Sequence, residues 1–193
     1  GKTIFNSDNR ECSGCDKVGI NSDEFPKIVN NYNQVFSKET AYQITSILEG
    51  VITRGTGKKL RDLKVPLAGK TGTTNNNYDA WFIGFNSNLV IGVYVGFDQP
   101  KTLGKYETGA KAALPIFKNF IKNALFKDDF KEFSIPKDIY FAPINYNTGE
   151  SADFGNQKAI IEAFKLEDIN NLKNNSLDSK SNYGKLIKFR QFY

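Results

Sequence analysis

Ala68-Gly69-Lys70-Thr71-Gly72-Thr73-Thr74 is the stretch that decides the fold of this chain. It places a cation, hydroxyls and glycines in a run that lacks helical periodicity. Two later runs of strand-forming residues, Tyr78 to Phe85 and Leu89 to Phe97, indicate two further strands. Asn86-Ser87-Asn88 supplies a turn between them. The stretch therefore lies in an antiparallel sheet.

The residue types of this strand suit it to hold an acyl or carboxylate oxygen. Alternate side chains of a strand share a face, so Lys70 and Gly72 point one way and the two threonines point the other. Gly72 lets a substrate backbone approach and pair with the strand edge, while edge amides can face a developing oxyanion. Alone, Lys-Thr-Gly is more typical of an exposed strand-to-turn segment than of a functional site. The loop Thr74 to Asp79 is either a substrate contact or a plain turn.

Helical patterns flank these strands. Ser37 is placed to cap a helix with Glu39 in its first turn, and Gly55-Thr56-Gly57 ends it. A second apolar helix from Leu114 to Leu125 is expected to pack on the sheet. The apolar stripe predicted for the first helix consists of Ala41, Ile44, Ile47, Leu48 and Val51.

This order of parts resembles the penicillin-binding proteins, most closely the transpeptidase domain of their class A, bifunctional branch. The resemblance covers most of the chain as far as about Phe164. It implies an α/β (α+β) fold with an antiparallel β-sheet flanked by helices, a partial β-lactamase/transpeptidase-like fold that lacks the upstream helical lobe. The blocks that carry it are Ala41 to Val51, Arg54-Gly55-Thr56-Gly57, Ala68 to Thr74, Asp79 to Gly84, Gly92 to Asp98 and Ala113 to Phe117.

The resemblance implies a serine D,D-transpeptidase that cross-links peptidoglycan stem peptides through an acyl-enzyme and that β-lactams acylate. By the same resemblance, Lys70, Thr71 and Thr73 orient the terminal carboxylate of the donor peptide or of the β-lactam. Gly72 leaves room for its backbone, and the Thr73 amide completes the oxyanion hole. Lys70 and Thr73 are therefore the candidate catalytic residues. No metal or organic cofactor is implied.

Enzymes of this family need a nucleophilic Ser with a Lys one helical turn later, a Ser-x-Asn and a Lys-Thr-Gly. Only the last is present in the expected context. Ser134-Ile135-Pro136-Lys137 spells the first, but Pro136 disfavours a helix and the segment follows the Lys-Thr-Gly, so we interpret it as a coil. Ser7-Asp8-Asn9 spells the second. We interpret it as a polar turn, because the family's element lies much further upstream.

No Ser of this chain has a plausible activating base, and the absence of His excludes a Ser-His-Asp arrangement. We therefore expect the chain to supply the Lys-Thr-Gly wall of an active site and an upstream half of the parent protein to supply the nucleophile. On this interpretation the chain alone is inactive. The alternative is a non-catalytic peptide-binding or interaction remnant of the same fold.

The composition is that of a folded segment. The chain has 193 residues, of which 39% are hydrophobic, and no apolar run approaches the roughly 20 residues that span a bilayer. The net charge is +5, with dispersed lysines that predict a solvated face and no nucleic-acid partner. Attraction to anionic wall polymers or phospholipid is the alternative. By resemblance, the segment is periplasmic and its parent is anchored in the inner membrane by sequence elsewhere.

Cys12 and Cys15 form a Cys-x-x-Cys pair. A zinc site needs more ligands than this chain offers, since it has no further Cys and no His. A thioredoxin-like motif would begin a helix, and Asp16-Lys17-Val18-Gly19 does not offer one. We predict a local disulfide, consistent with an oxidising compartment. Free thiols in a mobile loop are the alternative.

We divide the chain into three parts. Residues 1–127 are the C-terminal part of the transpeptidase domain, residues 128–166 an extension that packs on it, and residues 167–193 a tail whose composition predicts disorder. The strands around Trp81 and Phe82 carry apolar residues on both faces, which is typical of a sheet covered by helices. Lys38 to Ile52 is a candidate cover for the second face. Without the family's helical lobe we expect an exposed apolar face and a chain that associates or is marginally stable.

Overall fold

The computed structural model describes residues 10–13, 27–30, 34–126, 129–153, 155–166 and 168. They fall into two units, Gly1–Ser37 and Lys38–Tyr193. In the first unit, β1 (Arg10–Ser13) and β2 (Lys27–Asn30) pair antiparallel. The turn predicted at Ser7-Asp8-Asn9 lies outside the described residues. So does the disulfide predicted for Cys12 and Cys15, because only the backbone of Cys12 is described.

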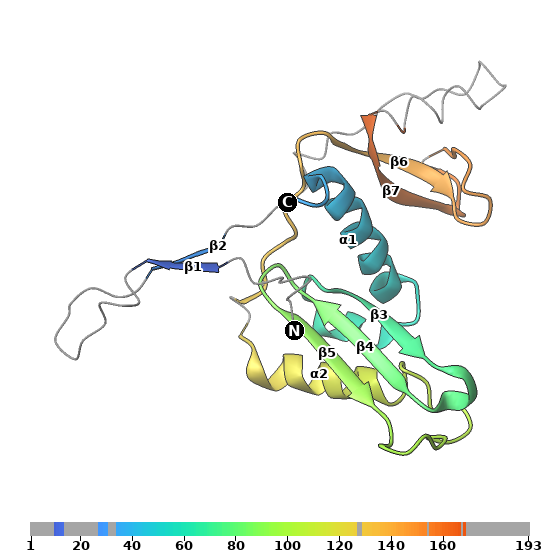
Figure 1. The fold of residues 1–193 in the computed structure, drawn as a ribbon. Coiled ribbons are helices and arrows are strands. Elements are labelled where there is room, and N and C mark those ends of the chain that lie inside the picture. Colours follow the sequence, from blue (N-terminus) through green and yellow to red (C-terminus); the bar gives the residue numbers. More distant parts are fainter. Residues whose placement is uncertain are drawn as a thin grey trace, which may run out of the picture. The chain divides into compact units, whose positions relative to one another are not determined.

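An antiparallel meander forms the main sheet of the second unit (Figure 1). The turn after its middle strand is made by Asn86, whose Oδ1 accepts hydrogen bonds from the amides of Asn88 at 2.8 Å and Leu89 at 2.7 Å. The predicted antiparallel sheet with flanking helices is confirmed. In spatial order the strands are β3 (Ala68–Thr73), β4 (Ala80–Phe85) and β5 (Val90–Val95).

The helix α2 (Ala113–Ala124) covers one face of this sheet, as predicted for the apolar helix after it. The rings of Phe82 on β4 and Phe117 on α2 meet edge to face with 4.8 Å between centroids. The short 3-10 helix η2 (Lys58–Leu63) adds Leu60 to the same core. The buried members of this cluster are Ile52, Leu60, Leu67, Phe82, Ala113, Leu114, Phe117 and Ile121.

The other face of the sheet, which we call the open face, carries exposed apolar side chains. Trp81, Ile83 and Tyr94 point to it and are 40%, 48% and 49% exposed. The expectation of a sheet covered by helices is therefore wrong for the face that carries Trp81. The expectation of an exposed apolar face is confirmed, because among the described residues no helix covers these three side chains.

The helix α1 (Lys38–Thr53) contacts β3 on one side and a second hairpin on the other (Figure 1). The predicted helix is confirmed, but two members of its apolar stripe, Ile44 and Ile47, are exposed. Tyr42, Gly50 and Ile52 are buried instead. Apolar spacing identified the helix, but the elements that pack against it decide which side is buried.

The second hairpin consists of β6 (Ile139–Asn145) and β7 (Ala159–Lys165). Tyr42 of α1 packs edge to face on Phe141 of β6, with ring centroids 6.2 Å apart. Ser134 lies in an irregular segment before β6, which confirms the coil interpretation. The predicted division of the chain stays a prediction. Residues 127 and 128 lie outside the described part, as does the predicted tail apart from Asp168.

Candidate active site

β3 is an edge strand, because among the described strands it pairs only with β4. The Thr74 amide donates to the Asp79 carbonyl at 3.1 Å, one position beyond the register pair Thr73 and Ala80. Along an antiparallel strand, successive residues direct their N–H and C=O groups alternately toward the partner and away from it. The main-chain groups of Thr71 and Thr73 therefore point to the unpaired edge of β3.

Lys70 places its ammonium at this unpaired edge. The residue is exposed and its register partner on β4 is Ile83, so its side chain starts from the open face. From there Nζ donates a 2.8 Å hydrogen bond to the Thr71 carbonyl, which points to the unpaired edge. An anion at this edge would meet a full positive charge beside outward-pointing amides.

Thr71 is joined to a turn that follows α1. Its Oγ1 lies 2.9 Å from Oγ1 of Thr56, and either hydroxyl can donate. Thr56 belongs to the Arg54–Gly57 turn, which closes α1 with a hydrogen bond of 2.9 Å from the Gly57 amide to the Val51 carbonyl. A hydroxyl from another element therefore stands directly beside the Lys-Thr-Gly threonine.

Close backbone packing surrounds Thr73. Its Oγ1 accepts a 3.0 Å hydrogen bond from the Gly109 amide. A Cβ on Gly109 would lie 2.3 Å from the Trp81 carbonyl oxygen, so only glycine fits there. A Cβ on Gly72 would lie 3.1 Å from Cβ of Trp81. Gly72 thus allows tight packing against β4 in addition to leaving space at the strand.

The loop between β3 and β4 is closed by its own hydrogen bonds and contains the short 3-10 helix η3 (Asn75–Asn77). Oγ1 of Thr74 accepts from the Asp79 amide at 2.8 Å and donates to Asp79 Oδ2 at 3.1 Å. Asp79 Oδ1 in turn accepts from the Tyr94 hydroxyl at 2.9 Å, which raises the pKa of Tyr94. The loop is an ordered turn, and a substrate contact there stays a prediction.

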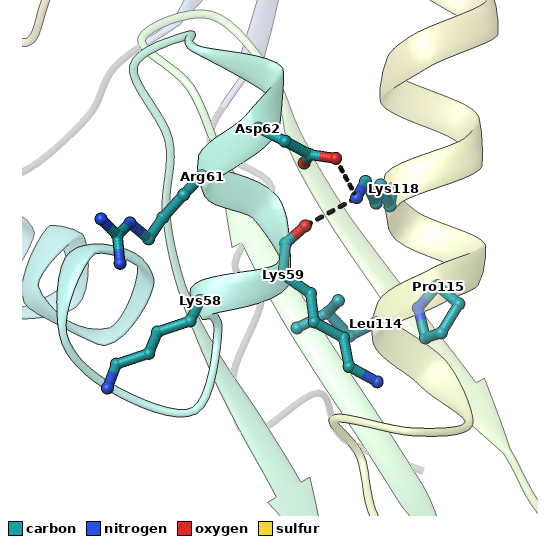
Figure 2. Close-up of a pocket in the computed structure, with 7 residues that line it drawn as sticks. All are labelled: Lys58, Lys59, Arg61, Asp62, Leu114, Pro115 and Lys118. Atoms are coloured by element: carbon teal, nitrogen blue, oxygen red, sulfur yellow. Dashed lines mark hydrogen bonds and ion pairs between the residues drawn. The ribbon is translucent and has the colours of Figure 1, made fainter.

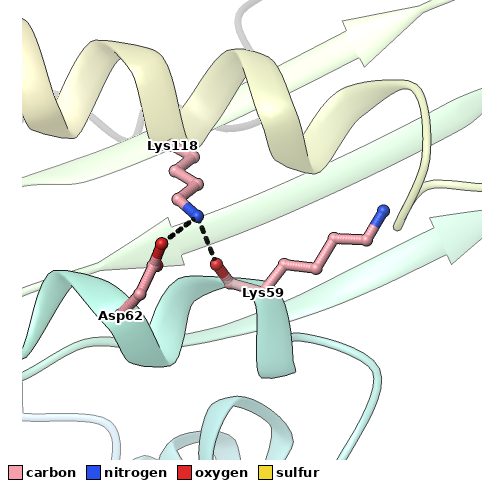
Figure 3. Close-up of polar contacts among 3 residues, drawn as sticks. All are labelled: Lys59, Asp62 and Lys118. Atoms are coloured by element: carbon pink, nitrogen blue, oxygen red, sulfur yellow. Dashed lines mark hydrogen bonds and ion pairs between the residues drawn. The ribbon is translucent and has the colours of Figure 1, made fainter.

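A basic cleft with a volume of about 720 Å³ lies between η2 and α2 (Figure 2). Nζ of Lys118 donates to Asp62 Oδ2 at 2.6 Å and to the Lys59 carbonyl at 2.7 Å (Figure 3). The hydrogen bond from Lys118 lowers the pKa of Asp62. Lys58 and Arg61 point away from Lys118 in Figure 2, so the cations do not converge, and the lysine ties η2 to α2. The lining is Lys58, Lys59, Arg61, Asp62, Leu114, Pro115 and Lys118.

The four predicted residues Lys70, Thr71, Gly72 and Thr73 thus lie together on one strand edge. Thr56 is the neighbour that the sequence analysis did not place there. The sequence feature that could have identified Thr56 is a hydroxyl between two glycines at the end of a helix. That it meets Thr71 depends on how α1 packs on β3, which local sequence does not specify.

The described ranges show neither a metal-binding cluster nor a membrane-spanning helix. They contain no group of three or more His, Cys, Asp or Glu side chains arranged to hold a metal ion. None of their helices combines the length and apolar character that a membrane crossing requires.

Comparison with known proteins gives consistent matches. The family model described as the penicillin binding protein transpeptidase domain matches residues 25–122. Penicillin-binding protein 1A of Rickettsia felis is 40% identical over 187 residues, which cover 94% of this chain and 23% of that protein. The Pseudomonas aeruginosa protein of the same name is 46% identical over 136 residues, covering 70% of this chain and 16% of that protein.

A solved structure agrees with these matches. The crystal structure of penicillin-binding protein 1A from Haemophilus influenzae superposes with a TM-score of 0.63 at 34% identity. The match covers 72% of this chain and 22% of that one. The chain thus spans less than a quarter of the length of these relatives.

Proposed function

Because this chain belongs to the penicillin-binding protein transpeptidase family, we propose that it forms the Lys-Thr-Gly wall of a serine D,D-transpeptidase whose nucleophile lies in sequence outside this chain. The unpaired edge of β3 carries the proposal. There the Lys70 ammonium lies 2.8 Å from the Thr71 carbonyl, beside outward-pointing amides. Such an edge suits an extended peptide that ends in a carboxylate.

In the proposed reaction, a serine hydroxyl attacks the carbonyl carbon of the donor peptide's terminal peptide bond. A serine ester forms, and the last residue leaves as an amine that takes up the serine's proton. An amine of a neighbouring stem peptide then attacks the ester, which forms the cross-link and returns a proton to the serine. A β-lactam undergoes the first step through its ring amide, and its leaving group stays attached.

Each motif residue has a role in this reaction. Lys70 and the Thr71 hydroxyl bind the terminal carboxylate. The Thr73 amide donates to the oxyanion, an interaction whose loss typically costs about 2.7–4 kcal/mol. Gly72 lets the donor backbone approach the strand. This scheme uses neither a metal nor an organic cofactor.

Family membership also supports the proposed partners and location. Peptidoglycan stem peptides and β-lactams are the ligands, and the upstream half of the parent protein completes the site. The location is the periplasm, with the parent anchored in the inner membrane. The relatives extend well beyond their matched parts, which leaves room for the nucleophile and the anchor.

Fluorescent penicillin tests the proposal. The full-length protein that carries this chain should be labelled, and changing the Ser of its upstream Ser-x-x-Lys to Ala should abolish labelling. The isolated chain should form no penicillin adduct by mass spectrometry. A folded full-length protein that takes no label would favour the non-catalytic peptide-binding module. A stable adduct on the isolated chain would contradict the external nucleophile and would direct attention to Ser7 or another serine.

A further inference from the structure

We propose that Thr56 positions the Thr71 hydroxyl for ligand binding, and that Glu162 of the β6–β7 hairpin holds the turn that carries Thr56. This inference rests on the proposed function, because it requires the Thr71 hydroxyl to bind a carboxylate. It adds a positioning residue from the end of α1 and gives the C-terminal hairpin a role at the site.

The first step concerns which hydroxyl of the Thr56–Thr71 pair donates the hydrogen bond. Oγ1 of Thr56 and Oγ1 of Thr71 are 2.9 Å apart. A carboxylate only accepts hydrogen bonds, so a Thr71 hydroxyl that binds one gives its single proton to the ligand. The Thr71 oxygen can still accept, and the Thr56 hydroxyl is in place to donate to it. Thr56 then fixes the Thr71 rotor and strengthens its donation through the connected bonds.

The backbone of the turn is fixed around Thr56. The amides of Arg54 and Gly55 donate to the Gly50 carbonyl at 2.9 and 3.0 Å. A Cβ on Gly55 would lie 2.8 Å from Cα of Val51, and one on Gly57 would lie 3.2 Å from the Val51 carbonyl oxygen. The two glycines therefore let the turn fold tightly onto α1, and Thr56 is presented from an ordered backbone.

Arg54 connects this turn to the second hairpin. Its guanidinium forms an ion pair with Glu162 of β7, whose side chain is only 13% exposed. Burial raises the pKa of Glu162 and the charge of Arg54 opposes that shift, so the carboxylate depends on its partner. A Cβ on Gly50 would lie 2.7 Å from Nη2 of Arg54, so this position leaves the room that the guanidinium occupies.

A second contact holds the hairpin to the same helix. Nε2 of Gln43 on α1 donates to the Ala163 carbonyl of β7 at 3.2 Å. The hairpin therefore contacts α1 both near its start and at the turn that follows it. Glu162 thus contacts Arg54, and Thr56, two residues further along the same turn, contacts Thr71.

The test compares acylation of the full-length protein by a fluorescent penicillin and by the methyl ester of the same compound. The acid should react faster than the ester, because only the acid offers a carboxylate. Thr56→Val keeps the side-chain shape but removes the hydroxyl, and should lower the acid-to-ester rate ratio about tenfold. Thr56→Ser keeps the hydroxyl and should retain the ratio within about twofold.

Thr71→Val separates this inference from the proposed function. If Thr71→Val lowers the ratio and Thr56→Val does not, the positioning role is wrong and the carboxylate-binding role of Thr71 stands. If Thr71→Val leaves the ratio unchanged, that role of Thr71 is itself wrong and the inference falls with it. Equal slowing of acid and ester in Thr56→Val would show only a structural effect and would also overturn the inference.

The hairpin's contribution has its own comparison. Glu162→Gln removes the charge that pairs with Arg54 and should lower the acid-to-ester ratio by a smaller factor, about threefold. Glu150→Gln, an exposed carboxylate beyond β6, is the matched control and should leave the ratio unchanged. A Glu162→Gln protein that melts at a lower temperature but keeps the wild-type ratio would contradict the role of the hairpin at the site.

Discussion

The two faces of the β3–β4–β5 sheet come from the same strands and have opposite environments. On the face that α2 covers, Phe82 is fully buried against Phe117. On the open face, its sequence neighbours Trp81 and Ile83 are each about half exposed. Both faces are apolar, so the difference comes from what covers them and not from composition.

This difference separates folding from assembly. The covered face provides the chain's own core, since it joins residues of the sheet, α1, η2 and α2 in one cluster. The open face is apolar surface, and a protein segment that covered it would gain stability from the burial of that surface. The unpaired edge of β3 borders both faces, because Lys70 starts from the open face and Thr71 from the covered one.

Truncation of a core side chain should give the largest effect. We expect Phe82→Ala to lower the free energy of unfolding by about 3–5 kcal/mol, because it leaves a cavity against Phe117. Ile83→Ala, the next residue on the open face, should cost less than about 1 kcal/mol. Urea denaturation of the chain followed by circular dichroism measures both. Equal losses would mean that the two faces are covered equally.

Two glycines allow the same comparison of the two faces, by adding a methyl group instead of removing a side chain. A Cβ on Gly84 would lie 2.6 Å from Cζ of Phe117, whereas one on Gly92 would meet Ile83 Cγ1 at 3.9 Å. We expect Gly84→Ala to destabilise the chain by roughly 1–3 kcal/mol and Gly92→Ala to be neutral or slightly stabilising. The same denaturation experiment decides. The reverse order of the two variants would contradict the assignment of the faces.

Charge on the open face should alter association with little change in folding. If the isolated chain associates through this face, Ile83→Lys should raise the concentration at which association begins by about tenfold or more. Sedimentation velocity over a concentration series measures this shift. A wild-type chain that stays monomeric with a sharp cooperative melt would show that the open face is tolerated without a partner.

A change at Glu49 on α1 should have the smallest effect on stability. It extends the comparison of covered and exposed side chains to a carboxyl that is partly buried. Burial raises its pKa from 4.5 to about 7, and the charge of Glu132 adds to this shift. The folded state therefore keeps a proton that the unfolded chain releases. This contribution is complete below pH 4.5 and is lost as the pH rises through about 7.

Glu49→Gln removes this titration. We expect it to match the wild type at pH 4 and to exceed its stability by about 1 kcal/mol at pH 8, a value reduced by solvent screening. Urea denaturation across this range measures the difference, with Glu150→Gln as the control. A wild-type stability that follows the Glu49→Gln profile at every pH would contradict burial of this carboxyl.

The features that the sequence predicted depend on interactions between residues close in sequence. The features that it missed depend on contacts between distant residues. The meander, the Asn86 turn and α2 follow from runs of strand-forming residues, turn chemistry and helical spacing, which are local signals. The apolar spacing of α1 does not specify its buried side, because that side depends on β3 and β7, which are distant in sequence. The contact between Thr56 and Thr71 was missed for the same reason, although each residue lies in a recognisable motif.

The acylation rate of a Lys70→Gln variant tests the central claim most directly. If the β3 edge binds the ligand carboxylate through this ammonium, the rate constant for fluorescent penicillin in the full-length protein should fall by about 100-fold. Lys101→Gln, an exposed lysine of the later loop, should leave the rate unchanged. A Lys70→Gln protein that reacts within about twofold of the wild type would contradict the account.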